Sequence, residues 1–467
     1  MELDSKNSTK YLKLLYILMS IQIVIGFIWM FFNIRTVSLF GDTQEYIELS
    51  KSLKIDTART IGFPFLLKLI LKMGEFTKIS YQIILYIFQL LVQFIGINYF
   101  INTICKLLHL SISLSKKIFV SMYLSTIPML IFLCFSVLTD SIANTMTICF
   151  LAAINAICLM KNEKKQDYII FVVSYIIAGL FRPEKRYELL CLAILILIFL
   201  AVRKKIKIKK GLFIFLIILI TSTITFEVNN ITQTKNLYGR EDESIVITVL
   251  KNRVAWGHIS TNYDKFSDDI KKIISYDEAV LIDSHNNNIN AVLAPIVKER
   301  AGEDKCSEIY LEIGLTILKN DFGGVVYDIV EDYISFVFTP FSSYLGLYGL
   351  CEVAASWNIY CMSAKTPYLT TFYNLIGHYI FFAILILVLI SIFTNKRNRF
   401  YSIIKNNIII SLILEILLRG AVFSFPFGAP PNDRYALIVY VIWAFIVLIC
   451  FPGVLPDISP YEDITKR

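Results

Sequence analysis

Histidine is scarce in this chain, with four residues among 467, and the sequence contains no Cys-x-x-Cys pair. This scarcity argues against a metal site built on histidine. The chain also has no glycine-rich phosphate loop, which argues against a nucleotide site. No small-residue cleavage site follows the first apolar run, 11–32, so we interpret that run as a retained membrane span rather than a signal peptide.

Apolar residues, in contrast, are abundant. Hydrophobic residues make up 56% of the chain and aromatics 14%, and the mean hydropathy is +0.64. A soluble domain needs more polar surface than this, and several apolar runs approach the roughly 20 residues that cross a bilayer. We therefore expect an all-α polytopic membrane protein with about ten transmembrane helices, at 11–32, 81–104, 117–135, 141–160, 167–181, 187–202, 211–227, 371–393, 403–424 and 435–451.

The net charge of +8 is explained by topology, because cytoplasmic loops of membrane proteins collect lysine and arginine. With ten spans, the basic clusters at 161–165, 203–210 and 395–399 all fall on one side. We assign that side to the cytoplasm, together with both termini. The long loop 228–370 and the segment 33–80 then lie outside.

Three regions follow from this division. The first, 1–227, is an N-terminal transmembrane core of seven spans, and its first outer loop, 33–80, carries two short helices that we expect at the membrane interface. The second, 228–370, is an extracytoplasmic and mostly helical loop region. The third, 371–467, is a C-terminal bundle of three spans. The spacing of Cys351 and Cys361 leaves a disulfide open in the second region.

Asp42 is the first candidate for chemistry, because it is a carboxylate at the outer mouth of the first span. Followed by Glu45 three residues later, it fits a helix-capping pattern. It also fits a general base, since a carboxylate at the membrane surface could accept a proton from an acceptor hydroxyl. The two roles do not exclude each other.

The turn "FRPEKRYE" places Arg182, Glu184, Lys185 and Arg186 between two spans on the outer side. Such residues commonly anchor helices at the interface. Cations are otherwise under-represented on that side, however, so this group favours an anionic partner. Phosphate is a suitable one, because guanidinium groups bind phosphate oxygens bidentately.

Charged residues within or near other spans are weaker candidates. Glu415 and Arg419 lie four residues apart on one helix, where they are either functional or a mutually neutralising ion pair. Arg434 lies at the outer mouth of the last span, and Asp140 follows a short outer turn, where a helix cap is favoured. We interpret His258, in the long loop, as structural or solvated.

Several of these motifs resemble those of GT-C glycosyltransferases, multispanning enzymes that use polyprenyl-phosphate sugars. Bacterial members related to protein mannosyltransferases and aminoarabinose transferases show an Asp, a nearby Tyr, and then Arg followed by Gly-aromatic-Pro. Here the corresponding residues are Asp42, Tyr46, Arg59 and the run 62–64. "LFRPEKRYELL" is similar to their Arg-Pro-Glu turn, and "NDRYALIVY" to their Arg-Tyr entry into a late span. One departure is that Gly41 stands where many relatives have a second acidic residue.

The resemblance implies that Asp42 is the catalytic base. It also implies that Arg182 and its neighbours Lys185 and Arg186, together with Arg434, hold the donor phosphate. The supporting residues would be Glu45, Tyr46, Arg59, Asp140, Glu184, Glu415 and Arg419. GT-C members differ in metal dependence, so a divalent metal remains open.

The expected reaction is therefore inverting transfer of a sugar from a polyprenyl-phosphate donor to an extracytoplasmic glycan, lipid or protein. One alternative is a polysaccharide polymerase or ligase acting on lipid-diphosphate glycans. Another is a transporter or flippase, although the sequence shows neither the paired repeats nor the broken helices typical of that class. Abundant Lys, Ile and Asn suggest an AT-rich bacterial genome, so we expect residence in a bacterial cytoplasmic membrane, with the active site facing outside.

Overall fold

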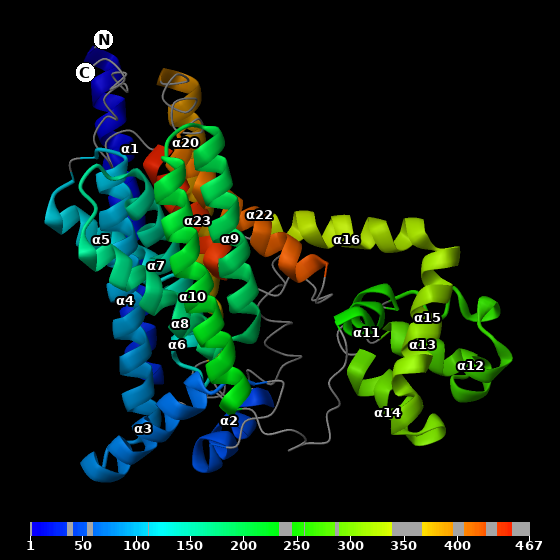
Figure 1. The fold of residues 1–467 in the computed structure, drawn as a ribbon. Coiled ribbons are helices and arrows are strands. Elements are labelled where there is room, and N and C mark those ends of the chain that lie inside the picture. The colour runs from blue at the N-terminus through cyan, green and yellow to red at the C-terminus, as the bar shows by residue number, and fades with distance from the viewer. Residues whose placement is uncertain are drawn as a thin grey trace. The chain divides into compact units, whose positions relative to one another are not determined.

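The computed structural model describes residues 2–34, 41–53, 59–110, 112–232, 245–255, 257–284, 289–338, 367–395, 406–425 and 437–450. Within these ranges the chain is helical and has no β-strand. The chain divides into two compact units (Figure 1): unit 1 comprises 1–238, 340–416 and 437–467, and unit 2 comprises 239–339 and 417–436. The expected all-α class is confirmed, and its long apolar helices make this a helical membrane protein.

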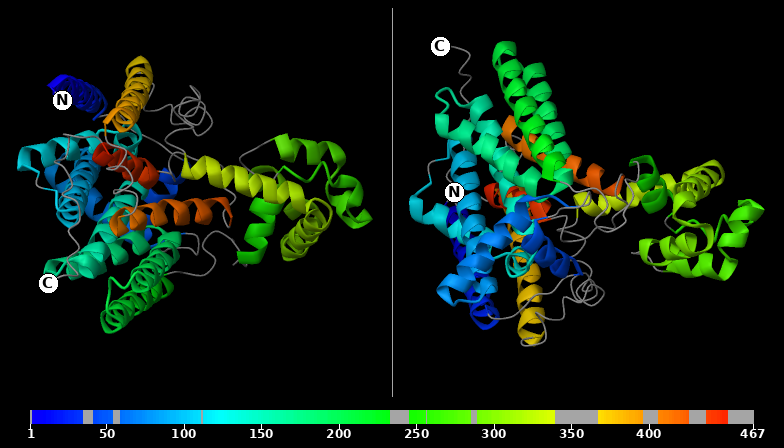
Figure 2. Two further views of the ribbon diagram at one scale, coloured as in Figure 1. Left: turned by 90° about the horizontal axis from the view of Figure 1, so that it is seen from above. Right: turned by 60° about the horizontal axis from the view of Figure 1, so that its bottom comes forward.

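Unit 1 is built around α7, whose apolar window is 89% buried and which packs against α4 and α8. Helices α9 and α10 run side by side on the outside of the unit (Figures 1 and 2). The helices of unit 1 are α1 (Glu2–Asn33), α2 (Gly41–Ser52), α3 (Gly62–Thr77), α4 (Tyr81–Leu107), α5 (Leu114–Ser125), α6 (Pro128–Cys134), α7 (Asp140–Leu159), α8 (Lys165–Phe181), α9 (Pro183–Val202), α10 (Ile208–Thr232), α20 (Pro367–Asn395) and α23 (Leu437–Cys450). Helix α22 (Asn407–Ser424) continues from unit 1 into unit 2.

Each of the ten expected spans contains a helix, but fewer meet the requirements for crossing a bilayer. Among the described residues, five helices are long and apolar enough, and a bent pair would make six. Helix α8 is short, at 17 residues, and α9 begins with the charged residues Lys185, Arg186 and Glu188. By length and composition, therefore, five or six of these helices qualify as spans within the described ranges. The five are Tyr11–Asn33, Tyr81–Leu107, Asp140–Leu159, Ile208–Thr232 and Asn407–Ser424.

The expected third span, 117–135, is not one helix. It is divided into α5 and α6, whose axes differ by 74°. Pro128 explains the break, because proline disfavours helical geometry in the residue before it. Ile127 accordingly has ψ of 126°, well outside the helical region. The expectation that the chain lacks broken helices was wrong.

Polar side chains from neighbouring helices stabilise this break. Gln22 of α1 donates to the carbonyl oxygen of Thr126 at 3.2 Å, and Gln93 of α4 donates to that of Ser125 at 3.1 Å. The hydroxyl of Tyr373, on α20, also donates to Thr126, at 2.5 Å. Non-helical backbone is tolerated at membrane depth only when its polar groups are satisfied in this way.

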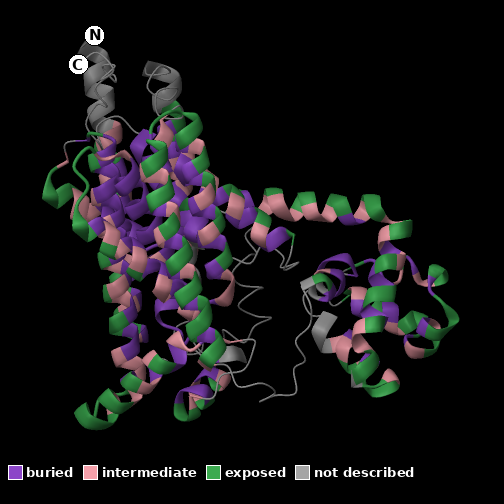
Figure 3. Cartoon of the chain, viewed as in Figure 1, coloured by how far each residue is buried: buried purple, intermediate pink, exposed green. Residues whose placement is uncertain are grey.

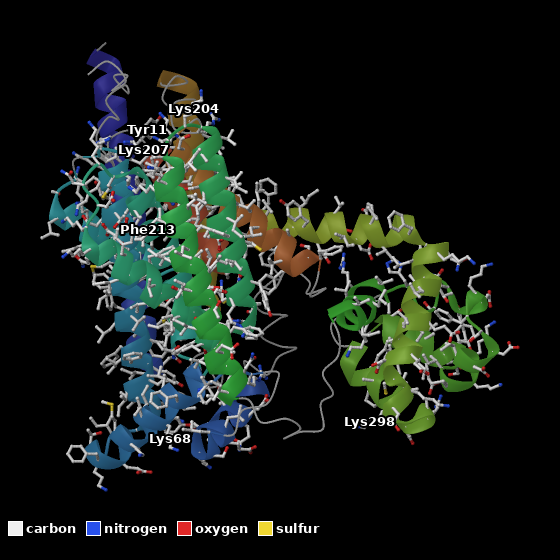
Figure 4. The ribbon with its side chains drawn as sticks, in the orientation of Figure 1. Tyr11, Lys68, Lys204, Lys207, Phe213 and Lys298 are labelled. Atoms are coloured by element: carbon white, nitrogen blue, oxygen red, sulfur yellow. The ribbon has the colours of Figure 1, made fainter. Side chains whose placement is uncertain are left out.

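The two ends of unit 1 differ in the loops that they carry. Lys204 and Lys207 lie at the same end as Tyr11, whereas Lys68 of α3 lies at the opposite end (Figure 4). The basic segment before α8 and the basic segment after α9 meet at the Tyr11 end, since Lys210 forms an ion pair with Glu163 at 2.6 Å. The α2–α3 segment and the α8–α9 turn lie at the other end (Figure 1).

Unit 2 contains most of the described part of the expected long loop, and it is helical as expected. Its core brings together apolar residues of the 247–259 segment and α15, including Leu250, Ile313 and Ile317 (purple in Figure 3). Gly314 allows this packing, because a Cβ there would lie 2.8 Å from the Cβ of Leu250. The helices are α11 (Ile245–Val249), the π-helical turn η1 (Leu250–Val254), α12 (Asp268–Ile273), α13 (Tyr276–Ser284), α14 (Ile289–Ala301), α15 (Cys306–Asn320) and α16 (Phe322–Val337). Cys351 and Cys361 lie outside the described residues.

Candidate functional site

The α2–α3 segment brings three of the predicted supporting residues together. Arg59 Nη2 lies 2.6 Å from Glu45 Oε2, and the Arg59 guanidinium lies 5.0 Å from the centre of the Tyr46 ring. The Tyr46 ring in turn meets the edge of Phe63, with centroids 5.0 Å apart. Tyr46 and Phe63 are buried, whereas the ion pair is partly exposed. This arrangement fixes the geometry of the segment that begins with Asp42.

The same segment packs directly onto the end of α8. The Phe63 and Phe181 rings have centroids 6.0 Å apart. A Cβ at Gly62 would lie only 2.5 Å from the carbonyl oxygen of Leu180, so a residue with a side chain cannot occupy this position without displacement. Because Arg182 follows Phe181, the structure brings the 59–63 motif next to the arginine-containing turn, more than a hundred residues later in the chain.

Arg182 lies between two carboxylates. Its Nη1 pairs with Asp140 at the start of α7, and its Nε pairs with Glu184 at the start of α9. Asp140 has no exposed surface. It occupies the first position of α7 rather than the expected cap, where the helix dipole also stabilises a carboxylate. The turn is thus joined to α7 by an ion pair that the sequence separation does not suggest.

Lys185 also has a carboxylate partner. Its Nζ lies 2.9 Å from Glu188 Oε1, and neither side chain has exposed surface. Glu188 was not among the predicted site residues. The i, i+3 spacing of the two residues on a helix would have been enough to indicate it.

Arg186 differs from these two cations. Its Nε donates to the carbonyl oxygen of Pro183 at 3.2 Å, and its guanidinium lies over the rings of Tyr187 and Phe226, at 5.7 and 5.2 Å. Among the described residues, no carboxylate lies within ion-pair distance of it. Its backbone is fixed as well, since the Tyr175 hydroxyl donates to the Arg186 carbonyl oxygen at 2.8 Å.

The charges in this region balance formally. Its three cations are Arg182, Lys185 and Arg186, and its three carboxylates are Asp140, Glu184 and Glu188. Such a network can hold α7, α8 and α9 together without a ligand, and its cations are also preorganised donors of the kind that binds anions.

Asn144 adds a buried amide to α7, one helical turn after Asp140. The residue is 1% exposed, and neither amide atom has a hydrogen-bond partner among the described residues. Buried polar groups are rarely left this way, so Asn144 is a candidate for contact with a ligand or water. Sequence reasoning missed it because a single Asn within an apolar helix carries no motif.

Other predicted residues cannot be placed in this geometry. Asp42 lies in the first turn of α2, but the structure does not describe its side chain. Arg434 lies outside the described residues altogether. Glu415 and Arg419 are fully buried in α22, and Arg419 lies over the Phe423 ring at 4.3 Å.

Unit 2 contains a separate charged cluster. His258 Nδ1 lies 2.9 Å from Asp321 and its Nε2 lies 3.0 Å from Asp328, while Arg253 pairs with Asp332 at 2.5 Å. Burial raises the pKa of Asp332, and the Arg253 charge offsets part of that effect. Because each ring nitrogen of His258 meets a carboxylate, the histidine links the start of α16 to its middle. This supports a structural role.

No group of three or more metal-ligating side chains occurs among the described residues. The comparisons add no family to this geometry: no protein-family model, curated protein or solved structure matches the chain.

Proposed function

We propose that this chain is a membrane glycosyltransferase that moves a sugar from a polyprenyl-phosphate donor to an extracytoplasmic glycan, lipid or protein. The observation that carries the proposal is the packing of the Tyr46–Arg59–Phe63 segment onto the end of α8, beside Arg182. Two motifs that are far apart in the sequence thereby form one end of one helix bundle. That end combines a carboxylate-bearing helix with a group of cations.

In the proposed reaction, Asp42 removes the proton from the acceptor hydroxyl. The acceptor oxygen then attacks the anomeric carbon from the face opposite the phosphate, so the bond to the lipid phosphate breaks with inversion. Negative charge grows on the departing phosphate, and nearby cations stabilise it. A lipid phosphate is a workable leaving group, so this reaction needs no nucleotide site.

The existing ion pairs suggest which of the cations contacts the departing phosphate first. Arg182 and Lys185 already have carboxylate partners, so a phosphate would compete with Asp140, Glu184 and Glu188 for them. Arg186 has no such competitor among the described residues. We therefore assign the first phosphate contact to Arg186, with Arg182, Lys185 and Arg434 contributing further positive charge.

The proposal places all ten apolar helices in a bacterial cytoplasmic membrane, with both termini in the cytoplasm. The gathering of the basic segments 161–165 and 203–210 at one end of the bundle, the end of Lys204 and Lys207 in Figure 4, supports this arrangement, since positively charged loops remain in the cytoplasm. The α2–α3 segment and the α8–α9 turn then face outside, where the acceptor is.

A transfer assay tests the proposal directly. Purified protein in detergent would be given a panel of polyprenyl-phosphate sugars and an envelope extract as acceptor. We expect transfer by the wild type and at least a ~100-fold loss in Asp42→Asn, the usual scale for removing a general base. Glu48→Gln is the matched control, because it changes an exposed carboxylate on the same helix.

The outcomes separate the two roles of Asp42. Loss of transfer in Asp42→Asn, with donor binding retained and Glu48→Gln active, supports the base. Transfer that survives Asp42→Asn would leave the enzyme class standing and make Asp42 a helix cap. If no polyprenyl-phosphate sugar in the panel binds or reacts, that result would argue against this class of donor.

A transporter or flippase is the second candidate, and the break between α5 and α6 is the observation that favours it. Broken helices form many transport sites. Here, however, Gln22, Gln93 and Tyr373 already bind the carbonyl groups at the break, which gives it a structural explanation. Movement of a lipid-linked substrate across proteoliposomes without sugar transfer would support the transporter instead.

A further inference from the structure

Helix α16 turns its acidic face toward its own unit. Asp321 and Asp328 contact His258, and Asp332 contacts Arg253 at 2.5 Å. These three acidic residues share one side of the helix, because they are separated by seven and four positions. The side of α16 that faces unit 2 therefore carries these carboxylates beside apolar residues such as Val325, which belongs to the unit 2 core.

The opposite side of the same helix is apolar and exposed. Its residues are Phe322, Val326, Tyr327, Val330 and Ile334, and their exposed fractions are 64, 38, 66, 48 and 52%. Figure 3 shows exposed surface along the length of α16. Residues 322, 326, 330 and 334 are each four positions apart and Tyr327 lies beside them, so they make a continuous stripe, and none of its side chains is charged.

Helix α16 thus has apolar residues on both sides, because Val325 and Phe336 are buried while the stripe is exposed. A helix on a water-soluble domain normally lacks such an exposed apolar stripe. Such a helix buries its apolar stripe against the core and presents charges to water. A large contiguous apolar surface normally marks contact with a membrane or a partner. The position of α16 in the chain decides between these two.

The C-terminal end of α16 packs against the end of a candidate membrane span. Phe336 stacks on Phe423 of α22, with centroids 5.5 Å apart and planes within 5°. Gly420 allows a close approach, because a Cβ there would lie 2.8 Å from Val337. Since α22 ends at Ser424, this contact lies at the last turn of the candidate span.

We propose that α16 is an in-plane membrane anchor of unit 2, with its apolar stripe in the boundary between lipid headgroups and acyl chains. With 16 residues and a charged face, the helix cannot span the bilayer alone. Aromatic residues such as Phe322 and Tyr327 suit that depth. Three of the acidic residues, Asp321, Asp328 and Asp332, contact His258 and Arg253 rather than lying in the stripe, whereas Glu331 beside the stripe is exposed.

Spin labelling of the full-length protein in lipid nanodiscs tests this anchor. In a cysteine-free background, nitroxides would be attached to Val326→Cys, Val330→Cys and Ile334→Cys, all at exposed positions that are not needed for packing. Power saturation then compares collisions with oxygen, which concentrates in lipid, and with a water-soluble nickel complex. The aqueous controls are Glu331→Cys on the border of the acidic face and Lys272→Cys on α12.

We expect oxygen accessibility to exceed nickel accessibility at the three stripe positions. At the two controls we expect nickel accessibility to exceed oxygen accessibility. Nickel accessibility at the stripe equal to that at Lys272→Cys would overturn the anchor, since the stripe would then face water. Low accessibility to both reagents at all three stripe positions would also overturn it, because protein would then cover the stripe.

Discussion

Asp140 shows how strongly a single buried residue can depend on a distant one. Its carboxylate has no exposed surface and pairs with Arg182, 42 residues later. A buried charge that loses its partner costs far more than the pair contributes. The Arg182 side chain thus has a structural role that must be separated from any contact with phosphate.

We expect Arg182→Met to destabilise the protein by about 3 kcal/mol or more, as for a broken buried ion pair. Adding Asp140→Asn to that variant should recover much of the loss, because the buried charge is then removed. Thermal unfolding in detergent measures both. A double variant no more stable than Arg182→Met would show that the pair is not the source of the loss.

Gly62 is a residue whose identity the packing of α3 on α8 requires. In Gly62→Ala the new methyl group would meet the Leu180 carbonyl oxygen, so we expect a loss of about 1–3 kcal/mol. Gly211→Ala is the matched control, because no atom lies within 4 Å of its Cβ position and alanine favours helix. Equal melting temperatures for the two variants would contradict the close approach of α3 to α8.

At the scale of elements, α13 and α14 are joined by one ion pair. Arg300 donates to both carboxylate oxygens of Glu278, at 2.8 and 2.6 Å, and also to the carbonyl oxygen of Ile273. The hydrogen bonds from Arg300 are the main cause that lowers the pKa of Glu278 to about 2. Ser275 contributes further by donating from its backbone.

This pair predicts a specific dependence of stability on pH. A glutamate in the unfolded chain has a pKa of about 4.3, so the pair contributes its full stability above that pH. The contribution should fall as the pH drops from about 4.3 toward the folded pKa of about 2. Thermal melts between pH 7 and pH 3 should show a smaller acid dependence for Glu278→Gln and Arg300→Gln than for the wild type. Parallel pH profiles for all three proteins would contradict this assignment.

At the scale of the whole molecule, the proposed topology separates the two ends of unit 1. In a cysteine-free background, Lys68→Cys should react with an impermeant thiol reagent from outside intact cells. Lys207→Cys should react only after permeabilisation, because it lies at the opposite end of the bundle (Figure 4). The reverse pattern would invert the orientation, and equal labelling of both would refute the placement of these residues on opposite sides.

The sequence by itself determined the class of this protein, because a mean hydropathy of +0.64 and apolar runs near bilayer length reflect a local transfer free energy. It also located helices in all ten expected segments and marked the α8–α9 turn as unusual. Each of these features depends on residues that are close together in the chain.

Only the tertiary structure decided which carboxylates pair with the cations of that turn, since Arg182 and Asp140 lie on different helices. It likewise revealed how Gln22, Gln93 and Tyr373 stabilise the break before Pro128, and that Asp332 of α16 pairs with the distant Arg253. Ion pairs, capped carbonyls and buried faces depend on contacts between distant elements. Local hydropathy and spacing do not contain that information, because the same helices could pack in other ways.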